Sequence, residues 1–280
     1  MALPTLNIVG AGHVGRVLGR LFDASGAAQV QDVLTRSHAS AQAAVDFMGA
    51  GRALPDASTL RRADVWMLAV GDDQIGPACA QLAATGLLQD AVVFHCSGAR
   101  SSAALQSAAD AGALVASVHP VRSFADPAAV AQDFAGTFCG VEGDAAALAQ
   151  LAPLLAKIKA RTVAIDAAAK TVYHAAAVFA SNYLVTVVDA ALRAYQAAGI
   201  PADVARELAR PLATETLANA LRLGPEAALS GPIARGDLQT VARQQQAIDG
   251  WDPDTGVLYA ALADATSLLA QRKRAGTLSI

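Results

Sequence analysis

The stretch Gly10-Ala11-Gly12-His13-Val14-Gly15 decides the fold. It follows the apolar run Leu6–Val9 and opens an amphipathic segment, so the glycines stand between a predicted strand and a predicted helix. In that setting Gly10 permits a tight turn, Gly12 lets the backbone approach a pyrophosphate, and Gly15 lets the helix pack on the strand. The helix N-terminus adds a positive partial charge. Residues 10–15 therefore predict a dinucleotide-binding turn rather than a merely structural one.

Short apolar runs then alternate with helical segments as far as residue 118, which is the pattern of βαβ units and a parallel sheet. We predict strands at Leu6–Val9, Val30–Leu34, Val65–Val70, Val92–His95 and Leu114–Val118, and two more at Thr137–Val141 and Thr162–Ile165. The last two flank a helix predicted over 144–157. The predicted fold class is α/β: a Rossmann-type, mostly parallel sheet in residues 1–166, followed by an all-helical domain in residues 167–280.

The helical part begins with an alanine-rich segment, Ala167–Ala198, which has no Gly or Pro until Gly199-Ile200-Pro201. We predict one continuous helix there, followed by helices at Ala202–Leu221, Asp237–Ile248 and Asp252–Ala270. The most apolar part, residues 175–191, is interrupted by Ser181, Asn182 and Asp189. Because a membrane-spanning helix needs roughly 20 residues with few such groups, we expect a buried helix of a soluble protein and no membrane partner.

Composition narrows the function classes. The 280 residues carry 21 Lys and Arg against 24 Asp and Glu, and a net charge of −3 is too balanced to predict a nucleic-acid partner. The three cysteines, Cys79, Cys96 and Cys139, form no Cys-x-x-Cys pair, which favours buried, reduced thiols over a disulfide framework or a metal site. No secretory signal is visible, so we expect a cytoplasmic protein.

The residues after the second predicted strand bear on which nucleotide binds. An acidic side chain there would hold the 2′-hydroxyl of NAD, but the strand ends in Thr35-Arg36-Ser37, and Asp32 lies inside it. An arginine with two hydroxyl neighbours can bind a 2′-phosphate through charge-assisted hydrogen bonds. We therefore predict NADP(H) rather than NAD as the cofactor. The alternative is that Arg36 is only a solvated loop charge.

Three further strand-end loops are expected to face the cofactor. They are Val70-Gly71 with the following Asp72-Asp73 pair, His95-Cys96-Ser97-Gly98, and His119-Pro120. Within them Ser97 and Gly98 are placed to approach the nicotinamide end. The aspartates need only cap a helix, and His95 and His119 are either catalytic or structural histidines with satisfied hydrogen bonds.

Three polar residues, Lys170, His174 and Ser181, share one stripe of the predicted long helix at 3.6 residues per turn. Small residues between them would let a flat ligand approach the helix. A lysine in a low-dielectric cleft can have its pKa lowered until it exchanges a proton near neutrality, as reduction of a carbonyl or imine requires. We therefore predict catalytic roles for Lys170 and His174. The alternative is a lysine at a helix start whose amine reaches solvent.

Several motifs give the chain a resemblance that covers nearly its full length. Beyond residues 10–15 they are His119-Pro120-Val121-Arg122-Ser123-Phe124, Tyr173-His174-Ala175-Ala176-Ala177, Ser181-Asn182-Tyr183 and Gly231-Pro232-Ile233-Ala234-Arg235-Gly236-Asp237. On these residues the chain resembles a bacterial family that joins a Rossmann-like domain to a DUF2520 domain, itself similar to the 6-phosphogluconate and β-hydroxyacid dehydrogenase superfamily. The resemblance implies hydride transfer from NADPH and a Lys-x-x-x-Asn pair on the long helix. Lys170 matches that lysine, but His174 replaces the asparagine, so the substrate need not be the same.

Further expectations concern the substrate side. We expect Arg235, together with Arg122, to receive a carboxylate or phosphate because guanidinium binds such groups bidentately, with Ser181 and Asn182 as further substrate contacts. Alternatively, Arg235 and Asp237 order their own turn as an ion pair and helix cap.

Two function hypotheses follow. The first is an NADPH-dependent reductase of a small carbonyl or imine compound, in which Lys170, His174 and His119 are the catalytic candidates. The second is a non-catalytic NADP(H) sensor whose helical domain contacts a protein partner. Related helical domains often dimerise, so the resemblance also implies a homodimer.

Overall fold

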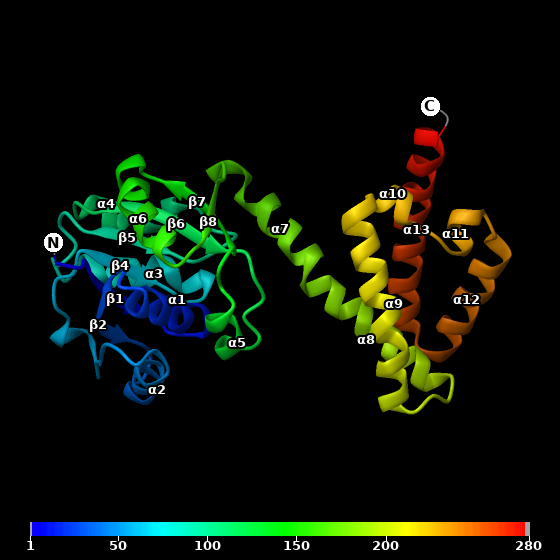
Figure 1. Cartoon of the computed structure of the whole chain (residues 1–280), viewed down its shortest axis with the longest axis horizontal. Helices are drawn as coiled ribbons and strands as arrows, with labels where there is room; N and C mark the ends of the chain where they lie inside the picture. Colours follow the sequence, from blue (N-terminus) through cyan, green and yellow to red (C-terminus); the bar gives the residue numbers. More distant parts are fainter. Residues whose placement is uncertain (1, 278–280) are drawn as a thin grey trace. The chain divides into compact units, whose positions relative to one another are not determined.

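The computed structural model describes residues 2–277 of a chain that divides into two compact units, Met1–Ala180 and Ser181–Ile280 (Figure 1). The sequence predicted a boundary after residue 166. Residues 167–180, which that prediction assigned to the helical domain, group with the first unit. Lys170 and His174 are therefore part of the same unit as the glycine turn.

The first unit is built on one eight-stranded sheet with the order β3-β2-β1-β4-β5-β6-β7-β8. Paired strands run parallel except β6 and β7, which are antiparallel. The strands are β1 Thr5–Val9, β2 Gln29–Leu34, β3 Arg52–Ala53, β4 Val65–Leu68, β5 Val92–His95, β6 Leu114–Pro120, β7 Phe138–Gly143 and β8 Arg161–Ala164. The predicted Rossmann-type, mostly parallel sheet is confirmed. The sequence missed β3 because two residues are too few to show a period.

Helices cover both faces of this sheet. Successive side chains of a strand point to opposite faces, so Ile8 of β1 enters one apolar core and its neighbour Val9 enters the other. The first core packs against α1 His13–Ala24, α2 His38–Met48, α5 Pro127–Gln132 and α6 Ala145–Lys157, and the second against α3 Ile75–Ala83, η3 Ser102–Leu105 and α4 Gln106–Asp110. The short helices η1 Ala57–Thr59 and η2 Asp72–Gln74 lie in loops. With both faces covered, ligands can reach the sheet at the ends of its strands.

The second unit is all helical, as predicted. Its helices are α8 Asn182–Ala197, α9 Ala202–Leu223, α10 Pro225–Ala228, α11 Pro232–Arg235, α12 Leu238–Trp251 and α13 Pro253–Thr277. Helix α9 packs against α8, and α13 packs against α12, α10 and α11 (Figure 1). The predicted stop at Gly199-Ile200-Pro201 falls between α8 and α9.

The prediction of one continuous helix over 167–198 is wrong. The segment consists of η4 Ala167–Ala169, α7 Lys170–Ala180 and α8. Between α7 and α8, Ser181 has φ −131° and ψ −70°, which lies outside the helical region. The predicted stripe of Lys170, His174 and Ser181 therefore loses its last member.

The prediction that this segment is buried is also wrong. In the described chain, residues 167–197 are apolar and long enough to cross a membrane by composition, with a mean hydropathy of 1.6 over an 18-residue window in which no residue is buried. Lys170, at the start of α7, is buried. A single stretch of this kind is weak evidence for a membrane span. More broadly, the described residues of the second unit bury only Ala205, Thr255, Gly256 and Ala270. The second unit on its own therefore has very little core.

Candidate active site

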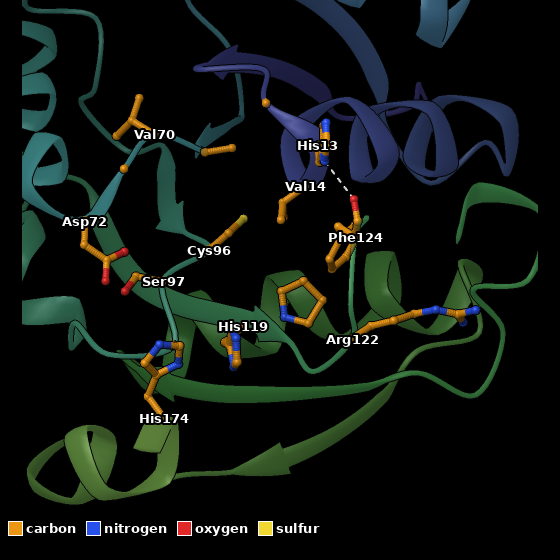
Figure 2. Close-up of a pocket in the computed structure, with 15 residues that line it drawn as sticks. His13, Val14, Val70, Asp72, Cys96, Ser97, His119, Arg122, Phe124 and His174 are labelled. Carbon is orange, nitrogen blue, oxygen red and sulfur yellow. Dashed lines mark hydrogen bonds between the residues drawn. The ribbon is translucent and has the colours of Figure 1, made fainter. Parts of the chain in front are cut away.

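A pocket of about 390 Å³ opens beyond the carboxyl ends of β1, β4, β5 and β6, within the first unit (Figure 2). Ligands of open α/β sheets bind at this end of the strands. Nine of the residues predicted for the site line it, namely Gly12, His13, Val14, Val70, Gly71, Ser97, His119, Arg122 and His174. The other lining residues are Ala69, Asp72, Cys96, Gly98, Pro120 and Phe124. The structure thus brings the predicted strand-end loops together at one place.

The three glycines of the turn differ in the space around them. Gly10 has φ +80°, and a Cβ on it would lie 2.5 Å from Cγ1 of Val70. A Cβ on Gly15 would lie 2.7 Å from the carbonyl oxygen of Gly10 and 2.8 Å from Cβ of Ala69, so Gly15 permits α1 to pack closely on the residues that follow β1 and β4. At Gly12 a Cβ would meet nothing within 4 Å, because this position faces open space. Gly10 and Gly15 therefore shape the turn, and Gly12 leaves room for a ligand.

The start of α1 fits a dinucleotide phosphate. The helix begins at His13 with Gly12 as its N-cap, and no side chain caps its first amides. Free amides at a helix N-terminus, together with the helix dipole, attract an anion. Val14 and His13 line the adjoining pocket, while Ala11 is buried and does not line it. The turn over residues 10–15 therefore fits the pyrophosphate of a bound dinucleotide.

Asp32 has a structural role, which agrees with the prediction that it does not hold a ribose. Its buried carboxylate pairs with Arg61 at 2.6 Å and Arg52 at 3.0 Å. Burial raises the pKa of Asp32, but the hydrogen bonds from Arg61 and Arg52 outweigh it and lower the pKa below its ordinary value. The carboxylate is therefore ionised and fully engaged by these two arginines.

The segment Thr35-Arg36-Ser37 follows β2 and leads into α2. The Thr35 hydroxyl donates to the Ser37 carbonyl at 2.8 Å, and the Ser37 hydroxyl caps α2 by accepting from the amide of Ser40 at 3.2 Å. Arg36 is exposed and makes no ion pair with any described residue. Its guanidinium is therefore accessible to a phosphate.

The loop after β6 is fastened at two points. Nδ1 of His13 donates to the carbonyl of Phe124 at 2.7 Å. Arg122 donates to the carbonyl of Asp133, to its carboxylate at 3.0 Å and to the hydroxyl of Thr137 at 3.3 Å, and its side chain extends away from the histidines of the pocket (Figure 2). The guanidinium of Arg122 is thus occupied by Asp133, so the structure does not present it for the predicted substrate contact.

Two histidines and a glycine meet at the wall of the pocket. The rings of His119 and His174 lie edge to face with centroids 5.7 Å apart (Figure 2). A Cβ on Gly98 would lie 2.5 Å from Nδ1 of His174 and 2.8 Å from Nε2 of His119, so only glycine fits there. Nδ1 of His174 is buried and has no hydrogen-bond partner among the described residues. A buried unpaired nitrogen is costly, and a ligand atom in the pocket would satisfy it.

His119 is held in an uncharged state. Its Nδ1 lies 2.8 Å from the hydroxyl of Tyr173, and the two rings are also in edge-to-face contact. Burial lowers the pKa of His119 to about 4, with further contributions from His174 and Lys170. At neutral pH the ring is therefore an uncharged hydrogen-bonding group at the pocket.

Lys170 lies behind the pocket and does not line it. Its side chain is only 3% exposed, and Nζ donates to the Ser97 carbonyl at 3.0 Å and to the Ser117 hydroxyl, with the Glu142 carboxylate at 3.6 Å. Burial lowers the pKa of Lys170, and the neighbouring Glu142 opposes that shift. The predicted cleft lysine is in fact engaged by oxygen atoms of the protein itself.

The loop after β5 is internally bonded, and its histidine is structural. Nδ1 of His95 accepts from the amide of Ser97 at 3.1 Å, so Nε2 donates to the carbonyl of Ser101 at 3.0 Å. The hydroxyl of Ser97 accepts from the amides of Ala99 at 3.1 Å and Arg100 at 3.0 Å. The geometry therefore fits the structural role predicted for His95, because both of its ring nitrogens have hydrogen-bond partners.

The cysteines are free thiols, and the predicted burial holds for two of the three. Cys79 and Cys139 are buried, and Cys96 is half-buried at the pocket wall. Burial raises the pKa of Cys96, which keeps it as a neutral thiol.

The remaining predicted residues belong to the second unit. Ser181 and Asn182 stand at the start of α8, and Arg235 ends α11 in an exposed position. Asp237 caps α12 by accepting from the amide of Thr240 at 3.1 Å. The predicted helix cap is therefore present, but Arg235 and Asp237 form no ion pair in the described chain.

Sequence reasoning missed four residues that shape the site: Tyr173, Glu142, Ser117 and Phe124. Tyr173 stood beside His174 in a quoted motif, so its position was visible but its contact with His119 was not. Glu142 follows an apolar predicted strand, where an acidic residue signals a buried partner. Phe124 likewise stood in a quoted motif, residues 119–124, but its contact with His13 was not visible. Ser117 carried no comparable signal.

Two family models match the sequence. A Rossmann-like domain matches residues 2–120, and DUF2520, a domain of unknown function, matches residues 137–266. The chain belongs to the Rossmann-like proteins that carry a DUF2520 domain. Curated proteins, by contrast, give no match.

Solved structures resemble this Rossmann–DUF2520 chain over nearly its full length. Protein TM1727 from Thermotoga maritima is 27% identical, with a TM-score of 0.73 and coverage of 96% of this chain and 99% of that chain. The "putative NADP oxidoreductase BF3122" from Bacteroides fragilis is 19% identical, with a TM-score of 0.80 and coverage of 95% and 98%. An imine reductase from Myxococcus stipitatus in complex with NADP+ is 18% identical, with a TM-score of 0.66 and coverage of 98% and 95%. At these identities the last two show that the Rossmann–DUF2520 chain has their fold.

Proposed function

We propose that this protein is an oxidoreductase that uses NADP(H) to reduce a small carbonyl or imine compound. The observation that carries the proposal is that one pocket joins an open glycine turn to the His119–His174 pair (Figure 2). An imine reductase with this fold binds NADP+, which supports the same class of chemistry. When bound, NADPH would supply a hydride to the substrate carbon.

The chain's own residues would hold the nucleotide at three places. The amides beyond Gly12 suit the pyrophosphate, and the exposed guanidinium of Arg36 suits the 2′-phosphate. The backbone at Ser97 and Gly98 borders the end of the pocket where the nicotinamide would meet the substrate.

We assign the substrate heteroatom to the two histidines. Both line the pocket, whereas Lys170 does not. Because its pKa is near 4, His119 is neutral at pH 7 and offers Nε2 as a hydrogen-bonding group, while Tyr173 holds Nδ1. The unpaired Nδ1 of His174 lies beside it. These nitrogens would orient the reducible C=O or C=N group, and a proton from solvent would complete the reduction through them.

Cofactor binding is the first test. NADPH and NADH are titrated by fluorescence into the wild-type protein, Arg36→Ala and a control variant, Arg222→Ala, which removes an exposed arginine of α9. We expect NADPH to bind more tightly than NADH, and Arg36→Ala to weaken NADPH alone by about 30-fold, the worth of a charge-assisted hydrogen bond. Equal affinity for the two nucleotides would exclude the NADP preference. No binding of either would exclude the oxidoreductase.

Turnover is the second test. A panel of ketoacids, aldehydes and cyclic imines is screened for oxidation of NADPH, with His119→Gln and His174→Gln as variants. We expect at least one compound to be reduced, with a large loss of kcat in both variants and little change in NADPH affinity. Cofactor binding without turnover, together with co-purification of one protein, would instead favour the NADP(H) sensor.

We also propose that the helical unit pairs with a second copy of this chain. In support, α8, α9 and α13 expose large apolar side chains, including Val185 at 68%, Leu221 at 81% and Val257 at 73%. A unit that buries so little cannot stabilise itself through its own core. The ionised pair of Asp189 and Arg193 on α8 would be costly in a bilayer core, so a protein surface is the better match.

Light scattering after gel filtration tests this pairing. We expect the mass of two chains for the wild type and of one chain for Leu208→Glu/Leu212→Glu, which charges two exposed leucines that share one face of α9. The control Leu3→Glu charges an exposed leucine of the first unit and should leave the dimer intact. If the wild type is a monomer and sediments with lipid vesicles, the exposed apolar side chains bind a membrane and not a second copy of the chain.

A further inference from the structure

The loop that follows β5, defined as residues 97–102 and ending at the first residue of η3, forms one wall of the pocket and carries Gly98 to the two histidines. Its two ends are bonded to buried side chains from other elements. At the first end, the carbonyl of Ser97 accepts from Nζ of Lys170 at 3.0 Å and from the hydroxyl of Ser117 at 3.3 Å. At the other end, the amide of Ser102 donates to Glu142 at 2.7 Å.

The two side chains that hold the loop also hold each other. Nζ of Lys170 lies 3.6 Å from Oε1 of Glu142, and their side chains are 3% and 6% exposed. Glu142 of β7 is paired across the sheet with Ser117 of β6, whose hydroxyl accepts from Lys170. The hydroxyl of Ser102 donates a second bond to Glu142 at 2.8 Å. Thus a single buried ion pair joins α7, β6, β7 and both ends of the loop.

This arrangement leaves little room for movement of Gly98. A Cβ at that residue would already collide with His119 and His174, so a small shift of the loop changes where both rings can sit. A buried ion pair that is broken on one side leaves an uncompensated charge, whereas removing both charges is often tolerated. The pair is therefore suited to fix a position at the pocket.

We propose that Lys170 and Glu142 are positioning residues, an ion pair that clamps the 97–102 loop against the pocket histidines. Lys170 then acts through the loop and does not itself transfer a proton to the substrate. Only the catalytic consequence rests on the proposed function, because the clamp is a property of the protein without ligands.

Limited proteolysis tests the clamp without any cofactor. Arg100 is exposed within the loop and provides a trypsin site, and cleavage there requires local opening. The full chain is compared as wild type, Lys170→Met, Glu142→Gln and the double variant, with the Arg100 fragment followed by mass spectrometry. We expect cleavage roughly tenfold faster in each single variant. In the double variant, which has no unpaired buried charge, it should return to within about threefold of wild type.

The matched control is Lys157→Met, which removes a lysine bonded to a backbone carbonyl at an exposed site. It should leave Arg100 cleavage unchanged. The clamp proposal is overturned if the single variants are cleaved at Arg100 at the wild-type rate. It is also overturned if the double variant is cleaved as fast as Lys170→Met. If Lys170→Met alone does not fold, the cleavage rate of Glu142→Gln is compared with that of the double variant, and the same outcomes decide the proposal.

A second readout separates the clamp from a general loss of stability. The charge of Lys170 contributes to the low pKa of His119, so NMR titration of the histidines should show that pKa rising in Lys170→Met but not in Lys157→Met. An unchanged His119 titration would place Lys170 away from the pocket histidines and overturn the proposal.

Turnover then separates positioning from proton donation. If Lys170 positions the loop, Glu142→Gln loses kcat about as much as Lys170→Met, and the double variant regains activity. If Lys170 is the proton donor, the double variant stays as inactive as Lys170→Met, which would overturn the inference. Failure of the oxidoreductase proposal would appear separately, as absence of NADPH binding in the wild type, and would leave the proteolysis and NMR results standing.

Discussion

The hydroxyl of Tyr173 lies 2.8 Å from Nδ1 of His119. This contact joins α7 to the end of β6, and it fixes the ring nitrogen that faces away from the pocket. Nε2, near Gly98, is then the nitrogen that remains for a ligand. The tautomer of a histidine follows from the hydrogen bond that its other nitrogen makes.

Replacing Tyr173 by Phe should therefore release the tautomer of His119 without disturbing the nucleotide. We expect the ¹⁵N chemical shifts of His119 to change from those of one tautomer to those of a mixture. We also expect kcat to fall by about 100-fold, as for loss of an orienting partner. Tyr259→Phe, which removes a tyrosine hydroxyl bonded to Gln244 in the second unit, is the control. Identical His119 shifts in Tyr173→Phe and wild type would contradict the role.

Gly12 and Gly15 should respond differently to a methyl group. The methyl group of Gly12→Ala points into open space, so the free energy of unfolding measured in urea should change by less than about 1 kcal/mol. NADPH affinity should fall at least tenfold, because the added methyl occupies the space of the pyrophosphate. Gly15→Ala forces its Cβ against the carbonyl of Gly10 and should cost about 1–3 kcal/mol of stability. Wild-type NADPH affinity in Gly12→Ala would argue against phosphate binding at this turn.

Gly98→Ala should impair the reaction more than the binding of cofactor. The new Cβ would lie 2.5 Å from Nδ1 of His174, so the imidazole or the loop must move. We expect kcat to drop more than about tenfold, with NADPH affinity within about threefold of wild type. Gly76→Ala on α3, where a Cβ meets nothing within 4 Å, should leave kcat unchanged. Equal kcat for the two variants would remove Gly98 from the reactive end.

Asp32 should make the stability of the fold depend on pH. Its folded-state pKa lies below the ordinary value of 3.8, so its ionised form stabilises the fold above that pH and the contribution disappears as pH falls through the folded pKa. Asp32→Asn should therefore be less stable than wild type by about 2 kcal/mol at neutral pH, with a difference that shrinks in acid. Urea unfolding at several pH values measures this. Asp46→Asn, an exposed carboxylate bonded to Gln42, is the control; a pH-independent difference for Asp32→Asn would contradict the assignment.

The features that the sequence predicted well are local ones. The turn at residues 10–15 and the strands around it depend on neighbouring residues, so their glycine spacing and apolar runs were sufficient. The same holds for the exclusion of Asp32, whose place inside β2 was visible. Arg36 and the two hydroxyl residues beside it stay a prediction until the nucleotides are titrated.

What the sequence could not predict depends on strands meeting across the sheet. The Lys170–Glu142 pair exists because β7 runs antiparallel to β6 and places Glu142 opposite Ser117. No local pattern specifies that register. The break at Ser181 was missed for a different, local reason: the alanine-rich segment around it contains neither Gly nor Pro.

The strand order separates two tasks along the edge of the sheet. Arg36 follows β2 on one side of β1, whereas His119 lies near the end of β6 on the other side, beyond β4 and β5. Under the proposed function, coenzyme choice and substrate choice would therefore be encoded by residues that do not touch. If the proposal holds, an exchange of residues 35–37 would change the preferred coenzyme and leave the residues at the His119 end of the pocket intact.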